Sequence, residues 1–304
     1  MKKAALFWVC VFAFARLFAQ ATPFKKSVLD SLKANEFNGS FSYLINLGQD
    51  GTSTLTTALD FGVMYSTKRS NYELVGSSFF SHFESTSTAN RFYTMLRGSL
   101  LSHKVEDGKL IEKRFYPEPF IMYSYDANRA INYRWQFGAN GVYEFKPGKF
   151  FRMKVGAGLL YEVENWQMVK KENVHLIDTL SDAEQKYLFD TIGINTKGQL
   201  YRNNIRLNLY TNFICQFTRA INLSAYVGIQ QPFVPPYHDL PPNSLFPVVT
   251  KRYPRLTIDT HLTFQIWKVL NLVTDFTMQY DKGQIPLYVP GFVYALTQGF
   301  QVQF

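Results

Sequence analysis

Residues 131–145 read INYRWQFGANGVYEF and show most clearly the alternation of apolar and polar residues that recurs along this chain. One alternate set of positions is apolar or small throughout: Ile131, Tyr133, Trp135, Phe137, Ala139, Gly141, Tyr143 and Phe145. The other set holds the polar groups: Arg134, Gln136, Asn140 and Glu144. Successive side chains of a β-strand point to opposite faces, so the alternation predicts a strand with one apolar and one polar face.

The same alternation recurs along most of the chain. It is clearest in six further segments: 151–164, 204–217, 221–229, 255–266, 270–280 and 292–304. Weaker alternation predicts five more strands upstream: 37–47, 54–65, 71–82, 91–101 and 114–125. The last of these contains Pro117 and Pro119, which have no N–H to donate to a strand ladder. The sequence therefore predicts about twelve strands.

These strands are too long for an ordinary soluble sheet. They run to about ten to fourteen residues, whereas soluble strands usually have about 5–6 and a tilted membrane-crossing strand needs about 9–11. Hydrocarbon offers no water to backbone N–H and C=O groups, so a sheet that crosses it has to close on itself. The pattern predicts an all-β fold, an antiparallel transmembrane β-barrel of about 12 strands over residues 36–304.

The connections between the predicted strands alternate in length. One set is short, near 66–70, 145–149, 218–220 and 267–269, although its member at 102–113 is longer than such a turn should be. The other set contains the long connections: 165–203, 231–254 and 281–291. This asymmetry is typical of barrels with short periplasmic turns and long extracellular loops. In the first long loop, Ser181 and Glu184 have the spacing of a capping box, which predicts a short helix over 182–190.

The composition excludes a helical membrane protein. The 304 residues include 28 Phe, 19 Tyr and 4 Trp, yet the mean hydropathy is −0.14. After residue 20 no segment approaches the roughly 18–20 consecutive apolar residues of a membrane-spanning helix. An apolar outer face averaged with a polar lumen and polar loops accounts for the slightly negative hydropathy.

The first residues have the features of an export signal. A basic start followed by the apolar run 4–18 predicts a signal peptide over 1–19. Residues 20–35 are expected to form a periplasmic N-terminal segment. Cys215 is the only cysteine after residue 19, so no internal disulfide is expected. Together with the barrel pattern, these features predict the outer membrane of a Gram-negative bacterium.

The chain ends GFQVQF, with Phe304 last on the final alternating strand. A terminal Phe in this setting looks like the signal by which the outer-membrane assembly machinery recognises its barrel substrates. Further segments resemble the salt-induced outer-membrane proteins (YdiY-like), a family of unknown function: GAGLLYE at 156–162, QQP at 230–232, and Tyr280-Asp281 followed by Pro286, Pro290 and Tyr294. The resemblance covers most of the chain after residue 19 and departs from the family at 165–203 and at the proline-rich loop 231–254. It implies a barrel fold and an outer-membrane location, and it implies no biochemical activity.

The polar strand faces supply candidate lumen-lining residues: Arg134, Arg152, Lys154, Glu162, Arg206, Arg255, Asp259, His261 and Asp275. In one interpretation these residues set the ion selectivity of a pore. In the other they form a balanced network of ion pairs that fills a narrow barrel. The predicted inner faces also carry Arg91, Arg97, Asp60, Glu73, Glu118, Glu144 and Glu164, which gives seven basic and eight acidic residues, so no preference for anions or cations follows. Twelve strands do not decide the matter, since about eight leave a packed interior and about sixteen leave a channel.

One strand suggests a hydrolase. His261 lies between Asp259 and Thr263 on a predicted inner face, which brings together an imidazole, a carboxylate and a hydroxyl. The catalytic groups of an outer-membrane phospholipase must face lipid, whereas His261 is predicted to face the lumen, so we expect no catalytic residue. The five His are scattered, and no metal site and no cofactor are expected. The net charge is +9, but an exported barrel with basic residues spread through its loops is not expected to bind nucleic acid.

Three functions remain as hypotheses. The first is an outer-membrane barrel of the salt-induced type that forms a narrow, porin-like channel for small solutes. The second is a non-conducting structural or accessory barrel in a larger outer-membrane complex. The remote third is a phospholipase-like membrane enzyme. The partners expected are outer-membrane lipid and lipopolysaccharide, the barrel assembly machinery during biogenesis, and proteins of an envelope complex.

Overall fold

The structure is a computed structural model, and it describes residues 36–49, 53–83, 86–106, 109–127, 130–148, 150–169, 171–218, 220–233, 254–267, 270–281 and 292–302. The predicted signal peptide (1–19), the predicted periplasmic segment (20–35), most of the proline-rich loop and Phe304 lie outside these ranges.

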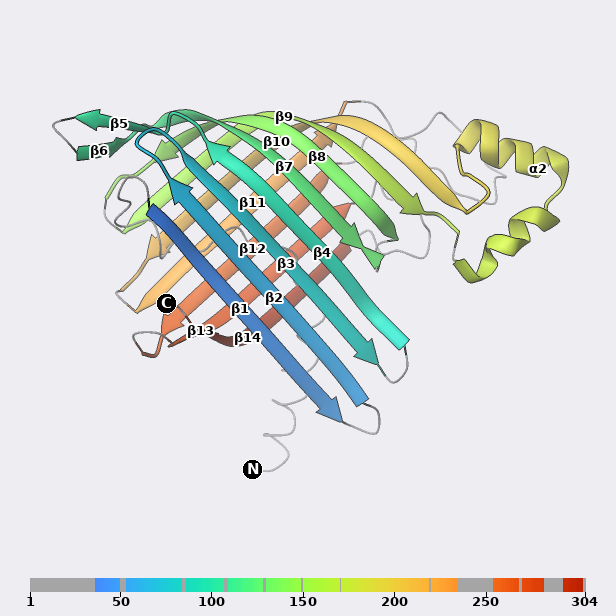
Figure 1. Ribbon diagram of the computed structural model, residues 1–304, viewed down its shortest axis with the longest axis horizontal. Helices are drawn as coiled ribbons and strands as arrows, with labels where there is room; N and C mark the ends of the chain where they lie inside the picture. The colour runs from blue at the N-terminus through green and yellow to red at the C-terminus, as the bar shows by residue number, and fades with distance from the viewer. Residues whose placement is uncertain are drawn as a thin grey trace.

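Twelve strands form one antiparallel sheet in the order β1-β2-β3-β4-β7-β8-β9-β10-β11-β12-β13-β14 (Figure 1). Their bounds are β1 Glu36–Gln49, β2 Ser53–Ser66, β3 Asn71–Phe83, β4 Thr86–Ser99, β7 Phe115–Asp126, β8 Ile131–Phe145, β9 Phe151–Gln167, β10 Gln199–Gln216, β11 Ile221–Pro232, β12 Arg255–Gln265, β13 Leu270–Asp281 and β14 Phe292–Val302. Every strand pairs with its neighbours in chain order except across β4 and β7, which enclose a separate hairpin. The predicted twelve antiparallel strands are confirmed.

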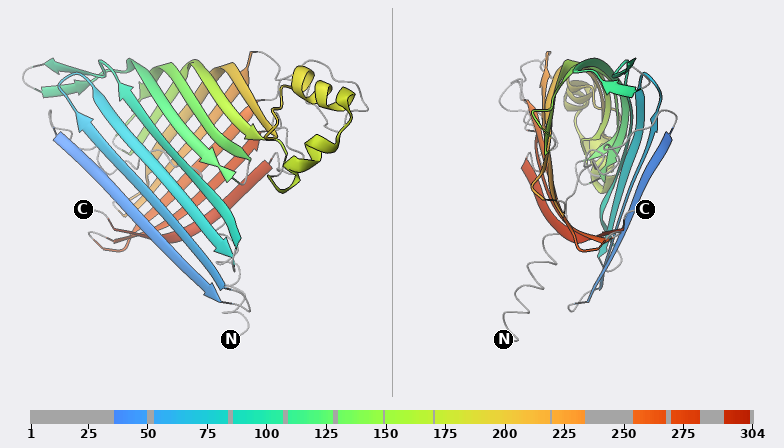
Figure 2. Two further views of the ribbon diagram at one scale, coloured as in Figure 1. Left: turned by 45° about the vertical axis from the view of Figure 1, so that its right-hand side comes forward. Right: turned by 90° about the vertical axis from the view of Figure 1, so that its left-hand side faces the viewer.

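The sheet curls into a β-barrel. Seen nearly end-on, it wraps round an oval interior (Figure 2), and β1 and β14, the two ends of the strand order, contact each other. The shortest strands of the sheet, β12 and β14, have 11 residues each, and the longest, β10, has 18. All of them reach the length that a tilted membrane crossing requires.

The two faces of the barrel wall differ in polarity as the alternation predicts. On β8, Trp135, Phe137 and Tyr143 are 39%, 43% and 46% exposed, whereas Arg134 and Gln136 are 4% and 2% exposed. The barrel is therefore inverted relative to a soluble protein, with apolar side chains outside and polar side chains enclosed.

The two prolines of β7 lie in the part of the strand that is no longer paired with β4. The β4–β7 pairing ends at Arg97 opposite Phe120, so Pro117 and Pro119 pair only with β8. The Pro117 carbonyl accepts a hydrogen bond from Leu100 N at 2.9 Å, which places that edge of β7 toward the end of β4. A missing N–H is tolerated at such an edge, and the strand continues through both prolines.

Short helices connect β9 to β10: the 3₁₀-helix η3 (Lys171–Thr179), α2 (Asp182–Lys186) and the π-helix η4 (Tyr187–Ile192). The predicted capping box is present: Glu184 N donates to Ser181 Oγ at 3.4 Å, and Ser181 N donates to the Glu184 carboxylate at 2.9 Å. The hydrogen bonds from Ser181 lower the pKa of Glu184. No helix in the described part of the chain is both long and apolar enough to span a membrane.

The helical connection packs against one end of the barrel (Figure 1). Leu188 and Ile194 of the connection form a buried apolar cluster with Ile131, Trp166 and Leu200 at the ends of β8, β9 and β10. This cluster fixes the connection over the end of the barrel that the sequence assigns to the extracellular side.

The opposite end of the barrel has a hairpin that the sequence did not predict. Residues 102–113, expected as an overlong turn, contain β5 (His103–Glu106) paired with β6 (Lys109–Glu112). His103 is 4% exposed, and its N–H donates to the Arg69 carbonyl in the β2–β3 turn at 3.2 Å. The hairpin is therefore attached to a neighbouring turn.

We expect Gly158→Ala to destabilise the barrel by about 1–3 kcal/mol, because an inserted methyl in a packed place costs about that much. A Cβ at Gly158 would collide with the Ala139 carbonyl oxygen and stand 2.7 Å from Asn140 Cα on β8. The measurement is urea unfolding of the refolded barrel in detergent, followed by Trp fluorescence. Gly148→Ala is the control, because a Cβ there meets nothing within 4 Å. Equal midpoints for the two variants would contradict this prediction.

We expect acidification to loosen the β5–β6 hairpin. Burial, aided by the positive charge of Lys146, lowers the pKa of His103. The folded hairpin thus favours neutral His103, and its stability falls as the pH drops below the ordinary pKa of histidine, where the unfolded segment binds a proton. Limited proteolysis across 103–112 between pH 7.5 and 5.5 measures this, and His103→Gln should flatten the pH dependence. A wild-type cleavage rate that is the same at pH 7.5 and pH 5.5 would contradict this prediction.

Candidate functional site in the lumen

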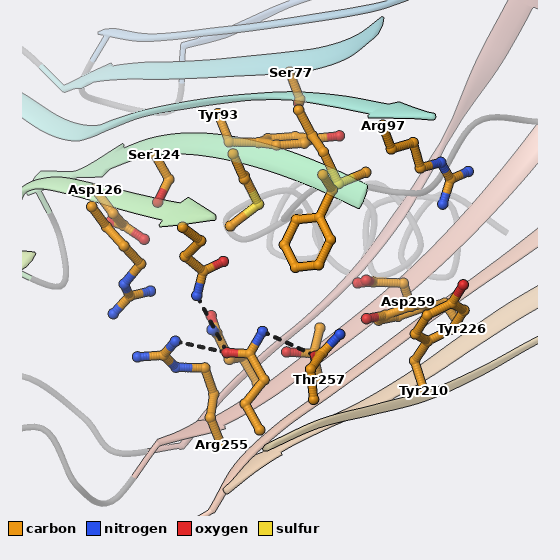
Figure 3. A pocket seen from close by; sticks show the side chains of 18 of the residues that line it. Ser77, Tyr93, Arg97, Ser124, Asp126, Tyr210, Tyr226, Arg255, Thr257 and Asp259 are labelled. Carbon is orange, nitrogen blue, oxygen red and sulfur yellow. Dashed lines mark hydrogen bonds between the residues drawn. The ribbon is translucent and has the colours of Figure 1, made fainter. Parts of the chain in front are cut away.

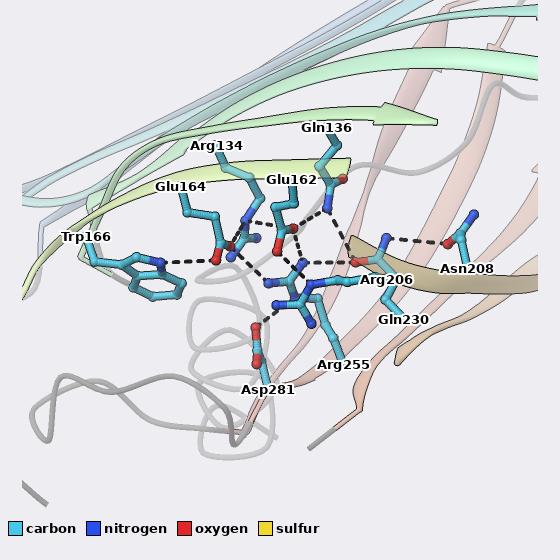
Figure 4. A network of polar contacts seen from close by, with 10 residues as sticks. All are labelled: Arg134, Gln136, Glu162, Glu164, Trp166, Arg206, Asn208, Gln230, Arg255 and Asp281. Atoms are coloured by element: carbon cyan, nitrogen blue, oxygen red, sulfur yellow. Dashed lines mark hydrogen bonds and ion pairs between the residues drawn. The ribbon is translucent and has the colours of Figure 1, made fainter. Parts of the chain in front are cut away.

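Glu162 is the centre of the polar contacts inside the barrel. Its carboxylate is 0% exposed and accepts hydrogen bonds from Arg206 Nε and Arg255 Nη1, each at 2.7 Å. Arg134 Nε lies 3.5 Å from the same carboxylate. Three guanidinium groups from β8, β10 and β12 therefore converge on one carboxylate of β9 (Figure 4).

Two more carboxylates complete this group. Arg255 also pairs with Asp281 of β13 at 2.7 Å and with Glu164 of β9 at 3.1 Å, and Arg134 pairs with Glu164. We call the set the arginine–carboxylate layer: Arg134, Glu162, Glu164, Arg206, Arg255 and Asp281. It has three positive and three negative side chains, so each buried charge has partners of opposite sign.

Amide side chains extend the layer along the lumen. Gln136 Nε2 donates to Glu162 at 2.5 Å, and Arg255 Nη1 donates to Gln230 Oε1 at 2.9 Å. Asn208 Nδ2 donates to Asn140 Oδ1 at 2.9 Å, which joins β10 to β8. These contacts hold strands together through side chains as well as through the backbone ladder.

A second group of charges lies at the turn end of the lumen. Arg152 pairs with Glu144 and, at 3.0 Å, with Glu112 of the β5–β6 hairpin. Lys154 Nζ stands 5.8 Å from the centre of the Tyr116 ring, within cation–π range. We call Glu112, Glu144, Arg152 and Lys154 the turn-end cluster. On β9, Glu162 and Glu164 belong to the layer, whereas Arg152 and Lys154 belong to the cluster. The two groups are therefore separated along the barrel axis.

A cavity of about 190 Å³ lies in the lumen beside the arginine–carboxylate layer (Figure 3). We call it the chamber. Its wall comes from β3, β4, β7, β8 and β10 to β13. On the turn side it is lined by Tyr210 and Tyr226, whose rings stack with centres 5.7 Å apart, and the Tyr210 hydroxyl donates to Glu118 at 2.6 Å. The chamber thus extends between a layer of ion pairs and a pair of tyrosines.

The structure places most of the predicted lumen residues inside the barrel. Six of them are buried: Arg134, Glu162, Arg206, Arg255, Asp259 and His261. Arg152 and Lys154 are half-buried in the turn-end cluster. Asp275 lies opposite His261 in the β12–β13 ladder, but its side chain is outside what the structure describes, as is Phe304. The ion pairs agree with the interpretation of a balanced network, and the role of these residues in solute passage stays a prediction.

Sequence reasoning missed the apolar part of the lumen. Met95, Phe120 and Met122 line the chamber together with Tyr210 and Tyr226. Strand parity is a signal that could have found them, because Met95 shares its face with Arg97 and Phe120 shares its face with Glu118. Because the interior is expected to be polar throughout, the sequence-based prediction does not assign these apolar residues to the lumen.

His261 is 5% exposed on the inner face of β12, and Asp259, two residues earlier, is 4% exposed. Both side chains are therefore enclosed, as their strand parity predicts. Within the described residues, no group of three or more His, Cys, Asp or Glu side chains is arranged to hold a metal ion.

No protein-family model matches this chain, and no curated protein matches it. Among solved structures it is similar to the NanC porin, with 7% sequence identity, 88% of this chain and 99% of that chain covered, and a TM-score of 0.42. It is also similar to the translocator domain of the autotransporter NalP from Neisseria meningitidis, with 11% identity, 99% and 96% coverage, and a TM-score of 0.43.

We expect Glu162→Gln to lower the free energy of unfolding by about 3 kcal/mol, because removing one partner of a buried ion pair leaves the other charges uncompensated. The variant keeps the side-chain shape and leaves three arginines facing two carboxylates. The unfolding midpoint in urea, read by heat-modifiable gel migration, measures the effect. Asp178→Asn on the exposed surface of η3 makes the same chemical change and should alter stability by less than about 0.5 kcal/mol. A Glu162→Gln barrel as stable as the control would refute the central role of this carboxylate.

Proposed function

We propose that this chain is an outer-membrane β-barrel of a Gram-negative envelope and acts as a narrow channel for small solutes, closed at rest by the arginine–carboxylate layer. The observation that supports it most is the burial of charged groups in the lumen: Glu162, Arg206 and Arg255 are 0%, 2% and 3% exposed. Water would reach such groups in a wide pore. At this level the lumen is therefore filled by its own side chains.

The outer face supports a membrane location. Leu159 is 53% exposed, Tyr161 44% and Ile205 50%, and they belong to the same face of adjoining strands. Soluble monomers rarely expose an apolar surface that continues from strand to strand. A hydrocarbon environment removes the cost of this exposure, and the ladder satisfies the backbone polar groups of these strands.

The resemblance to the salt-induced family belongs to the same proposal. In it, residues 1–19 direct export, Phe304 is the signal read by the barrel assembly machinery, and lipopolysaccharide surrounds the loops. The proposal assigns no catalytic residue. His261, the centre of the hydrolase hypothesis, is enclosed in the lumen, whereas a phospholipid substrate would meet the outer face.

The second candidate is a non-conducting accessory barrel in an envelope complex. The same burial of the arginine–carboxylate layer favours it, since a permanently filled lumen passes nothing. The helical connection between β9 and β10 gives such a barrel an exposed surface at one end, where Leu176 is 48% exposed. Conductance separates the two candidates.

We expect Glu162→Ser combined with Arg255→Ser to raise the single-channel conductance of the purified barrel several-fold in a planar lipid bilayer. The double substitution removes one charge of each sign and shortens two side chains at the centre of the layer, so the charge balance is kept while the lumen widens. The wild-type protein should show small events.

Asp178→Ser with Lys186→Ser is the matched control, because it also removes one charge of each sign but from the exposed helical connection. It should conduct like the wild type. If neither the wild type nor the Glu162→Ser, Arg255→Ser variant shows channel events, the channel is rejected and the accessory barrel is the remaining candidate. Large wild-type events would reject closure by the layer.

A further inference from the structure

Aromatic rings in the lumen wall are held flat against the strands by glycines. Each of three rings packs directly on a glycine: Phe120 on Gly138, Tyr210 on Gly156, and Tyr226 on Gly228. A Cβ at Gly138 would stand 2.6 Å from Phe120 Cζ, and one at Gly228 would stand 2.6 Å from the Tyr226 hydroxyl. With any other residue these rings would have to move toward the barrel axis. The glycines therefore keep the chamber open.

The lining of the chamber is mixed. On the β4 and β7 side Met95, Phe120 and Met122 form an apolar patch, beside charged residues of the same strands such as Arg97 and Glu118. On the β10 to β12 side the chamber is lined by polar groups, among them Asn208 and Thr257. Figure 3 shows Tyr93 and Ser124 on one side and Arg255 and Thr257 on the other. A ligand that fits both walls has an apolar body and a polar group.

The chamber has room for about one ring. Its volume is about 190 Å³, and an apolar cavity of roughly 150 Å³ is enough to bind benzene. The surplus leaves room for a substituent of a few atoms. The aromatic lining, with Tyr210 and Tyr226 already stacked, favours a flat ring over a branched aliphatic group.

The polar end of the chamber has a buried donor that a ligand oxygen could satisfy. Arg134 is 4% exposed, and its Nη2 is buried without a hydrogen-bond partner among the described residues. A buried donor without an acceptor is costly, so a ligand oxygen placed there would be stabilising. The charged residues that line the chamber comprise four arginines and three carboxylates: Arg91, Arg97, Arg134, Arg255, Glu118, Asp126 and Asp259.

We propose that the chamber is a binding site for a small single-ring aromatic carboxylate. The ring lies between the Met95–Phe120–Met122 wall and the tyrosines, and the carboxylate accepts from Arg134. A guanidinium suits this role because its planar set of donors matches a carboxylate. The inference rests on the proposed function, since it names the class of solute that the narrow lumen admits.

The test is isothermal titration of the refolded barrel in detergent with benzoate. Saturable binding of one benzoate per barrel is expected. Benzyl alcohol has the ring without the charge, and acetate has the charge without the ring, so each should bind at least about tenfold more weakly, a loss of about 1.4 kcal/mol.

Variants place the site in the chamber. Met122→Trp fills the apolar wall without touching an ion pair and should abolish binding. Gly138→Ala drives Phe120 inward and should weaken binding at least about tenfold. Gly141→Ala on the same strand is the control: its Cβ approaches Phe115, which is 65% exposed and can move aside, so binding should match the wild type. Heat-modifiable migration verifies that each variant is folded.

Three results would overturn the inference: no saturable binding of benzoate, equal binding of benzyl alcohol, or unchanged binding in folded Met122→Trp. Binding in detergent needs neither a membrane nor ion flow. If the barrel binds benzoate but never conducts, the binding site is supported and the channel function is rejected. If it conducts without binding benzoate, only the binding site is rejected.

Discussion

Glu162 holds a negative charge in a place that water hardly reaches, and the lumen depends on how that charge is satisfied. Removing a carboxylate from water costs several kcal/mol unless partners of opposite sign surround it. Here Arg206 and Arg255 donate to it at 2.7 Å and Arg134 stands close by. Each arginine comes from a different strand, so satisfying one charge fixes the distances across the barrel. Glu164 and Asp281 then neutralise the remaining positive charge, and the layer becomes a cross-brace between β8 and β13.

The glycine–ring pairs have the opposite effect on the lumen. The arginine–carboxylate layer fills space, whereas Gly138 and Gly156 create it by letting Phe120 and Tyr210 lie against the wall. The Tyr210 hydroxyl then reaches Glu118 at 2.6 Å, so the ring is also fixed by a hydrogen bond. Along the same strands, the filled arginine–carboxylate layer is followed by the open chamber. The interior is thus divided by residue size, although the backbone of the wall is continuous.

The sequence predicted the faces of the strands well and the contacts inside the barrel poorly. Arg134 and Trp135 fall on opposite faces because the side-chain period of a strand is two, and this needs no knowledge of neighbours. That Arg255 meets Glu162 depends on the stagger of strands across the lumen, and the two residues are 93 positions apart in the chain. Alternation contains no information on stagger.

Met95 and Phe120 were missed for a different reason, since apolar residues occur on both faces of β4 and β7. The β5–β6 hairpin was missed because its strands have only 4 residues each.

The charge balance of the layer decides how the lumen would select a solute. Three arginines and three carboxylates lie within a few ångströms of one another, so their fields largely cancel beyond about one Debye length, roughly 8 Å at physiological salt. A distant ion therefore meets little attraction or repulsion from the layer. In the proposed channel, selection acts by contact inside the chamber, through ring stacking, volume and single donors such as Arg134 Nη2. This favours discrimination by shape and hydrogen bonding over discrimination by the sign of charge alone.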